Sequence, residues 1–206
     1  TSYIWDYNLG YPIAEVKNAQ SQPIAYTSFE ADGKGNWTFT GAPTATLAIT
    51  GKKAYFFNSI NNIVKSALSS STVYIVSYWT RNTNAFTIAG TQAGYPVSGR
   101  TVNGWKYFEH RITGQTQVSV GGTGWIDELR LYPEKAHMTS YTYDPLIGMT
   151  SANDINNRIT FYEYDGLGRL SLIRDQDQNI LKKICYNFSG APENCTGAVT
   201  YMNSPV

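Results

Sequence analysis

Charged residues are scarce in this chain of 206 residues: Asp, Glu, Lys and Arg make up 15% of it, against about 25% in average soluble proteins. The charges nearly cancel and leave a formal net charge of +1. Nucleic acids and anionic membranes attract proteins through an excess of basic residues, so the charge balance gives no basis for either partner. The sequence also lacks an apolar run of the roughly 18 residues that a membrane-spanning helix needs.

Histidine and cysteine are scarce too, with two residues of each. His110 and His137 have no neighbours at metal-ligand spacing, and no nucleophile elbow, phosphate loop or His-Glu-x-x-His pattern occurs. Asp127 and Glu128 are adjacent, so on a strand they should point to opposite faces rather than at one bond. We therefore expect a protein that is not an enzyme.

The two cysteines, Cys185 and Cys195, bracket a short loop that contains Gly190 and Pro192. A disulfide across this loop fits an oxidising compartment, and free thiols or pairing with other sequence are the alternatives. Structural zinc needs about four ligands, which two cysteines alone do not supply. Because the chain begins with Thr1 and not with Met, we expect it to be an excised or processed piece.

Thr, Ser, Asn, Gly and Tyr are abundant instead, and this composition favours a β-rich protein of extracellular type. One short phrase, apolar–x–aromatic–Asp/Asn, recurs four times, at residues 3–6, 141–144, 162–165 and 184–187. The last three copies follow at steps of 21 and 22 residues, whereas the first lies well over a hundred residues earlier. This spacing predicts a repeat array that is interrupted by an inserted domain.

Each repeat has the pattern of a β-hairpin. Residues 160–165 and 169–174 alternate in polarity and are joined by Gly166-Leu167-Gly168, a turn sequence. The carboxylate of Asp165 is expected to accept hydrogen bonds from the turn amides. Polar turns at residues 153–157 and 175–179 connect one hairpin to the next, so the sequence predicts a meander of strands.

Residues 162–170, YEYDGLGRL, resemble the tyrosine-aspartate (YD) repeat of bacterial Rhs proteins, in the version found in large surface proteins of Bacteroidetes. The resemblance covers about residues 1–20 and 138–188 and is weaker in the last copy, where Asn187 replaces Asp. It implies a structural β-sheet array without catalytic residues. A further hypothesis is a toxin-delivery Rhs polypeptide, of which this piece would form part of the carrier.

The insert carries many short strand patterns separated by turn signals, which indicate a β-sandwich or jelly roll. The order of Phe29-Glu30, Trp37 and Gly51, followed by residues 74–79, 105–108 and 125–131, resembles a jelly-roll carbohydrate-binding module. The expected fold is therefore all-β, with a jelly-roll β-sandwich inserted between YD-type β-hairpin repeats. The expected segments are a first hairpin (1–20), the jelly roll (21–136), further hairpins (137–189) and a C-terminal loop or linker (190–206).

The jelly-roll resemblance implies a structural calcium ion. The matching positions are Glu30 and Asp127 as carboxylates, with backbone oxygens near Ser28 and Lys53, and calcium takes about 6–8 oxygen ligands. In such a module the first and last strands would lie side by side, so the two acids can meet although they are far apart in the sequence. The alternative is that both are ordinary acids at strand ends.

The same resemblance implies a glycan site built on exposed aromatic rings. Candidate platform residues are Trp79, Tyr95, Trp105 and Tyr107, and candidate polar partners are Arg81, Asn82, Asn84 and Gln92. The alternative places such aromatics in the core, above all Trp37, Tyr74, Trp125 and one of Trp79 and Trp105.

Two functions follow as expectations. The first is a non-catalytic extracellular or cell-surface segment, structural or adhesive, that joins other copies through open β-edges into a filament. Residues 1–20 would then pair with residues 138–188 within one chain or between chains. The second is a carbohydrate-binding module that recognises a glycan through its aromatic residues.

Overall fold

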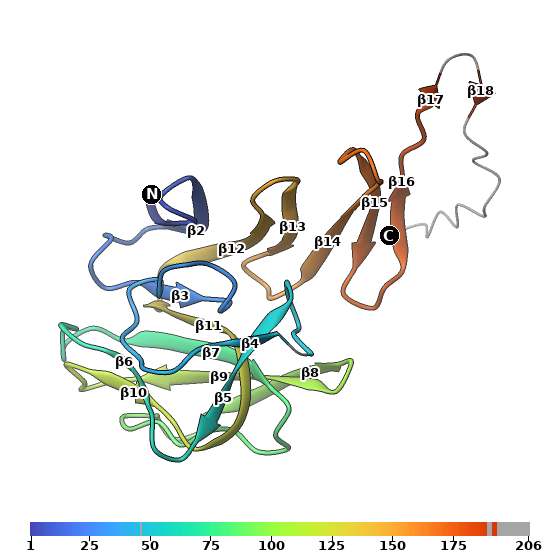
Figure 1. Ribbon diagram of the computed structural model, residues 1–206. Coiled ribbons are helices and arrows are strands. Elements are labelled where there is room, and N and C mark those ends of the chain that lie inside the picture. Colours follow the sequence, from blue (N-terminus) through green and yellow to red (C-terminus); the bar gives the residue numbers. More distant parts are fainter. Residues whose placement is uncertain (46, 189–190, 193–206) are drawn as a thin grey trace, which may run out of the picture.

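The computed structural model describes residues 1–45, 47–188 and 191–192. In this part of the chain all the assigned elements are β-strands, with no helix among them (Figure 1). The all-β prediction is confirmed. The strands form two large antiparallel sheets and two small two-stranded pairs. Across the described residues, no helix has the length and apolar character needed to cross a membrane.

The first large sheet, here called the repeat sheet, has the strand order β1-β2-β12-β13-β14-β15-β16. Its strands are β1 (Ser2–Asp6), β2 (Tyr11–Lys17), β12 (His137–Asp144), β13 (Gly148–Asn153), β14 (Ile159–Tyr164), β15 (Leu170–Asp175) and β16 (Ile180–Lys183). β2 pairs directly with β12, with Val16 opposite Met138 and Ala14 opposite Ser140. The first hairpin and the later hairpins therefore join within one chain, and the meander continues across the insertion.

Residues 21–136, here called the insert, form the remaining layers. Their main sheet has the order β4-β5-β11-β7-β9-β8, with β3 also paired to β11, and β6 and β10 form a separate pair. The strands are β3 (Ala25–Thr27), β4 (Thr44–Ala45), β5 (Lys53–Asn58), β6 (Ile63–Lys65), β7 (Tyr74–Thr80), β8 (Val97–Val102), β9 (Trp105–Ile112), β10 (Val118–Val120) and β11 (Thr123–Pro133). This arrangement is consistent with a β-sandwich.

The first strand of the insert lies beside the last, as the resemblance to a jelly-roll module implied. β3 pairs with β11 in antiparallel register, with Thr27 opposite Leu129 and Ala25 opposite Leu131. The pairing brings the two ends of the insert together, so the chain leaves β2 and returns to β12 at neighbouring points. The interruption of the repeats is therefore compatible with an unbroken repeat sheet.

The main sheet of the insert is covered on both faces. Every residue of β7 is buried: Tyr74, Val76 and Tyr78 pack into the core inside the insert, whereas Ile75 and Trp79 belong to two clusters shared with the repeat sheet. Figure 1 shows the repeat sheet lying across the insert. The molecule thus has three layers, and the main sheet of the insert is the middle one.

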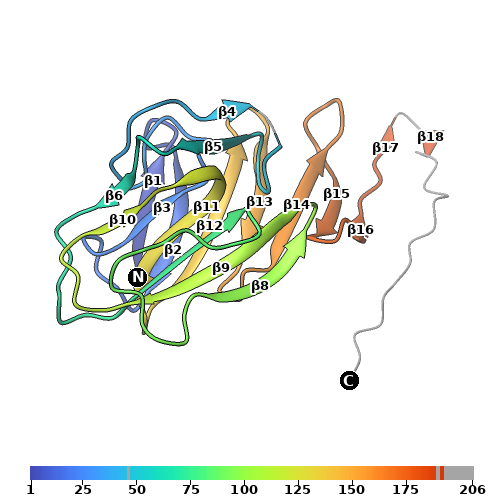
Figure 2. The same cartoon turned by 90° about the horizontal axis from the view of Figure 1, so that it is seen from below.

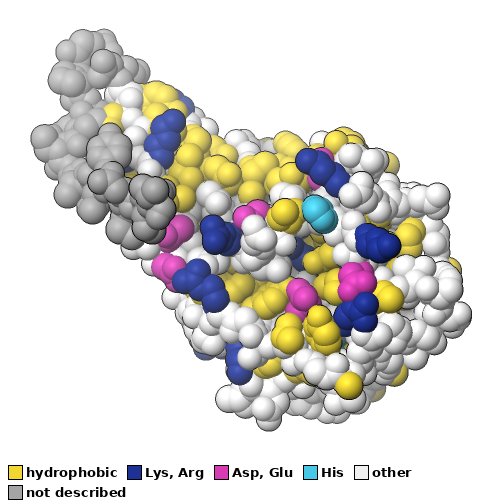
Figure 3. Space-filling model, turned by 180° about the vertical axis from the view of Figure 1, so that it is seen from behind, with side chains coloured by type: hydrophobic (Ala, Val, Ile, Leu, Met, Phe, Trp, Pro, Cys, Tyr) yellow, Lys and Arg dark blue, Asp and Glu magenta, His cyan; other side chains and the backbone are white. Residues whose placement is uncertain are grey.

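The last strands of the repeat sheet extend beyond the insert, as Figure 2 shows from below. Residues of β15 are half-buried and those of β16 are exposed, because the insert does not cover them. Figure 3 shows the far side, where apolar side chains continue from the main body along this extension. The remaining described pair is β17 (Asn187–Phe188) with β18 (Ala191–Pro192).

Carboxylates organise the turns of the repeat sheet, as predicted. Asp165 Oδ1 accepts hydrogen bonds from the backbone amides of Leu167 and Arg169, both at 2.9 Å. The turns at the other end repeat this arrangement, since Asp154 Oδ1 accepts from Arg158 N at 2.9 Å and Asp175 Oδ1 accepts from Asn179 N at 2.9 Å. The turn geometry is therefore fixed by local sequence.

Candidate functional site

A β-bulge in β11 sets the geometry of a buried group of polar and charged residues that includes Asp127, Glu128 and Arg130. The register between β11 and β7 shifts between Asp127 and Arg130, and Glu128 has a φ of 53°, which is uncommon for a residue other than glycine. The bulge turns both neighbouring acids toward Thr50: the Thr50 amide donates to Asp127 Oδ2 at 3.3 Å and the Thr50 hydroxyl donates to Glu128 Oε1 at 2.6 Å. The expectation that the two acids point to opposite faces is wrong, because a bulge breaks the alternation of a strand.

The Glu128 carboxylate lies between the insert and the repeat sheet, with its side chain 1% exposed. On the insert side, Oε1 accepts from the Tyr26 hydroxyl at 2.6 Å as well as from Thr50. On the repeat-sheet side, Oε2 accepts from Ser140 Oγ at 3.0 Å and from Asn153 Nδ2 at 3.2 Å. Both oxygens are therefore bound, each by a different layer.

Arg130 makes the complementary connection, since its guanidinium reaches from β11 into the repeat sheet. Its Nη2 donates to Ser140 Oγ at 2.6 Å and to the carbonyl of Asn153 at 3.0 Å, and its Nη1 donates to Asn157 Oδ1 at 3.0 Å. Nη2 also lies 3.7 Å from Glu128 Oε2. Glu128, Arg130, Ser140 and Asn153, here called the junction network, join strands β11, β12 and β13.

Burial and charge act together on the titratable groups at this junction. The pKa of Asp127 is raised well above its usual range by burial and then by the neighbouring charge of Glu128. The pKa of Tyr26 is raised in the same way, by burial first and then by Glu128. Asp127 Oδ2 also accepts from Ile49 N at 2.9 Å and Oδ1 from Glu128 N at 2.7 Å. All four carboxylate oxygens of the pair thus have protein partners, and the pair has a structural arrangement.

The residues expected to bind calcium hold a loop through backbone amides. Glu30 Oε1 accepts from the amide of Lys52 at 2.6 Å and also from the amide of Lys53. Asp127 Oδ2 accepts from the amides of Ile49 and Thr50 in the same loop. The Lys53 ammonium donates to the carbonyl of Glu30 at 3.1 Å. Ser28, two residues before Glu30, is buried. N–H donors therefore bind Glu30 Oε1 and both carboxylate oxygens of Asp127, and a calcium ion with its about 6–8 oxygen ligands stays a prediction. Burial raises the pKa of Glu30.

The expected glycan platform is contradicted at three of its four positions. Trp79, Trp105 and Tyr107 are only 2%, 1% and 9% exposed, and they form one cluster with Ile159 and the partly buried Phe161 of β14. The repeat sheet covers the face on which these rings lie, and Asn157 Nδ2 donates to the Tyr107 hydroxyl at 2.7 Å. Stacking on a sugar requires an exposed ring face, which these residues do not offer.

The other candidates for the glycan site are dispersed. Tyr95 is half-buried in the segment before β8. Arg81 lies against the ring of Trp105 at 6.0 Å, and Asn82 Nδ2 donates to the carbonyl of Thr123 at 2.8 Å. Gln92 accepts a hydrogen bond from Arg111, and Asn84 is exposed. Among the described residues, no hydrogen bond joins Tyr95, Arg81, Asn82, Asn84 and Gln92 to one another.

His110 is buried, and its ring nitrogens lie 3.1 Å from the Tyr78 hydroxyl and 3.0 Å from the Thr91 hydroxyl. Burial lowers the pKa of His110 to about 4.

The disulfide expected between Cys185 and Cys195 stays a prediction, because Cys195 lies outside the described residues, as does most of the expected C-terminal linker.

A second recurring arrangement joins the hairpins to one another. The aromatic residue of each later phrase donates its hydroxyl to a backbone carbonyl of the preceding hairpin: Tyr143 to Pro12 at 3.1 Å, Tyr164 to Met149 at 2.9 Å and Tyr186 to Leu170 at 2.9 Å. Three of the hairpins have a register shift next to this aromatic residue, between Ile4 and Trp5, Thr142 and Tyr143, and Glu163 and Tyr164. Bulges redirect side chains, and for Tyr143 and Tyr164 the register shift accompanies the contact with the preceding hairpin.

No sequence motif marks the junction network. The one signal was that a chain so poor in charge places three ionisable residues within the otherwise apolar segment 125–131. Buried charges are rare unless they are paired, so such a cluster points to partners elsewhere in the fold.

The chain was compared with family models and with curated proteins, and no family model and no curated protein matches it.

Proposed function

We propose that this chain is a non-catalytic structural segment of an extracellular protein, in which the repeat sheet carries the insert in one fixed orientation. The observation that supports this most is the junction network, in which Glu128 and Arg130 of the insert bind Ser140 and Asn153 of the repeat sheet. A flexibly attached domain would not bury ionised groups against its carrier, because each such group needs its partners in place.

The shared apolar clusters support the same proposal. Trp79, Trp105 and Tyr107 of the insert pack with Ile159 of the repeat sheet, and Ile24, Tyr26 and Tyr132 pack with Ile4, Val16 and Met138. Aromatic side chains bury large areas and dominate such contacts. Separating the layers would expose these rings to water, so the insert and the repeat sheet are expected to unfold together.

Denaturation followed by two probes tests the proposal. Far-UV circular dichroism reports on strands in both layers, while tryptophan fluorescence reports mainly on the insert, which holds four of the five Trp residues. We expect coincident transitions, the sign of one cooperative unit. Two separated transitions would contradict a rigid segment.

Glycan recognition is the competing function, and a glycan array compares the two. The structural proposal predicts no signal that depends on Trp79 or Trp105, because both rings are buried. Binding that is lost in the Tyr95→Ala variant, with its fold unchanged by circular dichroism, would instead favour a glycan site on the insert.

A further inference from the structure

We propose that neutral His110, with its proton on Nδ1, holds the loop between β7 and β8 against the main sheet of the insert, and that protonation of Nε2 in acid releases this loop. The loop comprises residues 81–96 and is here called the β7–β8 loop. His110 lies in β9 and alternates with Phe108 and Ile112, which pack into the core inside the insert. The inference therefore goes beyond the proposed function, because the junction network lies on the other face of the main sheet.

The position of each proton follows from the hydrogen bonds of Thr91. The Thr91 hydroxyl donates its single proton to the carbonyl of Ile88 at 2.7 Å, the shorter of its two contacts. Toward His110 Nδ1, which is 3.0 Å away, Thr91 Oγ1 can then only accept, so Nδ1 carries a proton. A neutral imidazole has one N–H. Nε2 is therefore an acceptor, and the Tyr78 hydroxyl, 3.1 Å away, donates to it.

The other end of these contacts returns to the same loop. The Tyr78 hydroxyl oxygen accepts from the amide of Phe86 at 2.8 Å, so the hydroxyl is used both as acceptor and as donor. Tyr78, His110 and Thr91, here called the His110 network, thus bind the β7–β8 loop at Phe86 and again at Ile88. All the hydrogen bonds run in one direction, so one misplaced proton disturbs the whole series.

The network is buried on the side of the insert. Tyr78 and His110 are 0% and 1% exposed, and Phe86 and Ile88 of the loop are buried in the same core. Water cannot reach the ring while the loop is in place. The ring therefore depends on protein partners for every hydrogen bond that it makes.

The core on this face offers no counter-charge for an imidazolium. Its titratable side chains are all tyrosines, namely Tyr55, Tyr74 and Tyr78. Burial alone lowers the pKa of His110, to about 4, so no charged group among the described residues acts appreciably on the ring.

The charged residues near the loop and along β9 bind elsewhere. Lys106 shares the face of His110, and its ammonium lies 3.4 Å from the carbonyl of Thr83. Arg81 lies against the ring of Trp105 on the other face. The neighbours of His110 in β9 also point to that face: Glu109 accepts from Tyr107 at 2.9 Å, and Arg111 pairs with Glu134. A proton on His110 Nε2 is therefore not balanced by any of these groups.

Protonation breaks the series at Tyr78. Nε2 becomes a donor, so the Tyr78 hydroxyl must accept from His110 while it still accepts from the amide of Phe86. The hydroxyl proton of Tyr78 then has no acceptor, and the imidazolium is buried without a counter-charge. Both changes cost free energy in apolar surroundings. Movement of the β7–β8 loop away from the sheet admits water and removes both costs.

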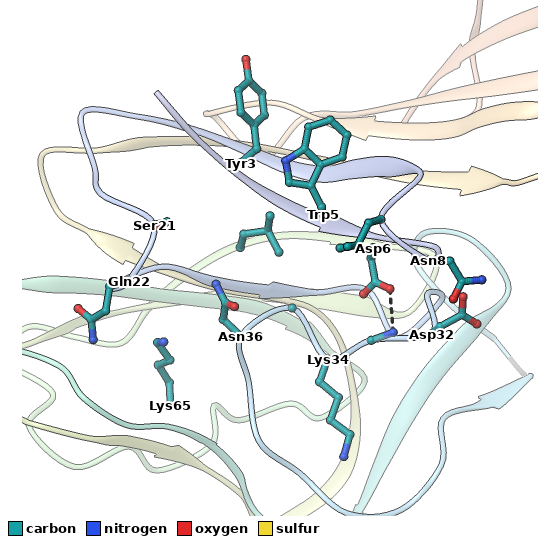
Figure 4. A pocket seen from close by; sticks show the side chains of 14 residues that line it. Tyr3, Trp5, Asp6, Asn8, Ser21, Gln22, Asp32, Lys34, Asn36 and Lys65 are labelled. Atoms are coloured by element: carbon teal, nitrogen blue, oxygen red, sulfur yellow. Dashed lines mark hydrogen bonds between the residues drawn. The ribbon is translucent and has the colours of Figure 1, made fainter.

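A loop held by a carboxylate provides the comparison. Asp6 of β1 accepts from Gly33 N at 2.8 Å, and Figure 4 shows this hydrogen bond in the pocket beside β1. An ionised carboxylate only accepts, so this contact requires no ordered series of hydroxyl protons. The amide of Gly33 therefore serves as the reference for effects that are specific to the His110 network.

Release of the loop would also change a cavity at one end of the insert. Asn82, Asn84 and Phe86 of the loop line this cavity together with Gly122 and Thr123, and its volume is about 490 Å³. The His110 network therefore maintains the shape of this cavity at neutral pH.

Nitrogen-15 NMR of the imidazole rings tests the tautomer in the whole chain. The sequence contains two histidines, so the His137→Gln variant leaves the signals of His110 alone. At pH 7 we expect the coupling pattern of a neutral ring that is protonated on Nδ1. A ring protonated on Nε2 instead would overturn the proposal.

Amide hydrogen exchange between pH 7 and pH 3, corrected for the intrinsic rate, tests the release. The Phe86 amide should lose protection by about tenfold or more as His110 becomes protonated, while the amides of β7 keep theirs. In the His110→Gln variant, the side-chain amide offers an acceptor and a donor but does not titrate, so Phe86 should stay protected at pH 3. Equal loss in this variant and the wild type, or simultaneous loss in β7, would overturn the proposal.

Tyr78→Phe tests the ordered series at pH 7, because it removes one hydroxyl and keeps the ring. Protection of the Phe86 amide should fall about tenfold, while that of the Gly33 amide stays unchanged. The NMR titration midpoint of His110 should rise, because the neutral ring loses the donor at Nε2. A merely structural role of Tyr78 would leave this midpoint where it is, and that result would contradict the proposed series.

Discussion

Replacing Arg130 by methionine should destabilise the protein severely, because the Arg130 side chain is buried between the insert and the repeat sheet, where it is 1% exposed. The substitution keeps an unbranched apolar stem but removes the guanidinium, which donates to Ser140, to Asn157 and to the carbonyls of Asn153 and Asp154. Glu128 then remains buried as an unbalanced charge. Removing one partner of a buried pair costs about 3–5 kcal/mol, and the total stability of a domain is only about 5–15 kcal/mol.

Urea denaturation followed by circular dichroism measures this loss as a change in the free energy of unfolding. Arg174→Met is the matched control, because Arg174 pairs with Glu163 at the surface, where their side chains are 23% and 44% exposed. Exposed pairs contribute about 0–1 kcal/mol, so the control should change stability by less than about 1 kcal/mol. An Arg130→Met variant no less stable than the control would refute the account of the junction.

A double variant isolates the charge itself. Adding Glu128→Gln to Arg130→Met removes the unpaired carboxylate and should restore at least about 1 kcal/mol relative to the single variant. If the double variant is as unstable as the sum of both single variants, the two residues act independently and the proposed pairing is wrong.

Three further predictions concern titration, metal and packing. Burial lowers the pKa of His110 from about 6.5 to about 4, so the unfolded chain binds the proton more readily than the folded one. The free energy of unfolding should therefore fall by roughly 3 kcal/mol as the pH drops through this range. Urea denaturation at a series of pH values should show that His110→Gln abolishes this slope and that His137→Gln keeps it. EDTA or excess calcium should shift the melting temperature by less than about 1 °C, because backbone amides already donate to the Glu30 and Asp127 carboxylates. A bound structural ion would instead give a shift of several degrees. Trp105→Ala should lower the free energy of unfolding by about 3–5 kcal/mol as a core truncation; a folded variant with unchanged stability would place this ring outside the core.

The features that local sequence encodes were predictable. Alternation with period two and the Asp-to-Gly turns predicted the hairpins around Asp165, because strand alternation and turn chemistry depend on residues close together in the chain. The pairing of β3 with β11 joins residues about a hundred positions apart, and it was expected only from the jelly-roll resemblance, not from local pattern. These features led to the all-β fold class that the structure bears out.

The features that depend on distant residues were not predictable. Trp79 and Trp105 looked like exposed platform candidates because nothing in their own strands reveals that Ile159 and Phe161 of the repeat sheet cover them. The bulge at Glu128 reverses the expected face of one acid, and a bulge leaves no mark in the alternation of residues 125–131. The junction network depends on both effects at once.

Native-state hydrogen exchange tests the central claim, that insert and repeat sheet form one cooperative unit through the junction network. The amides of β7 and β11 in the insert, and of β12 and β13 in the repeat sheet, should exchange with one common free energy close to that of global unfolding. The Arg130→Met variant should lower that value in all four strands together. Exchange of β12 and β13 at a clearly lower free energy than β7 and β11 in the wild-type protein would contradict the account.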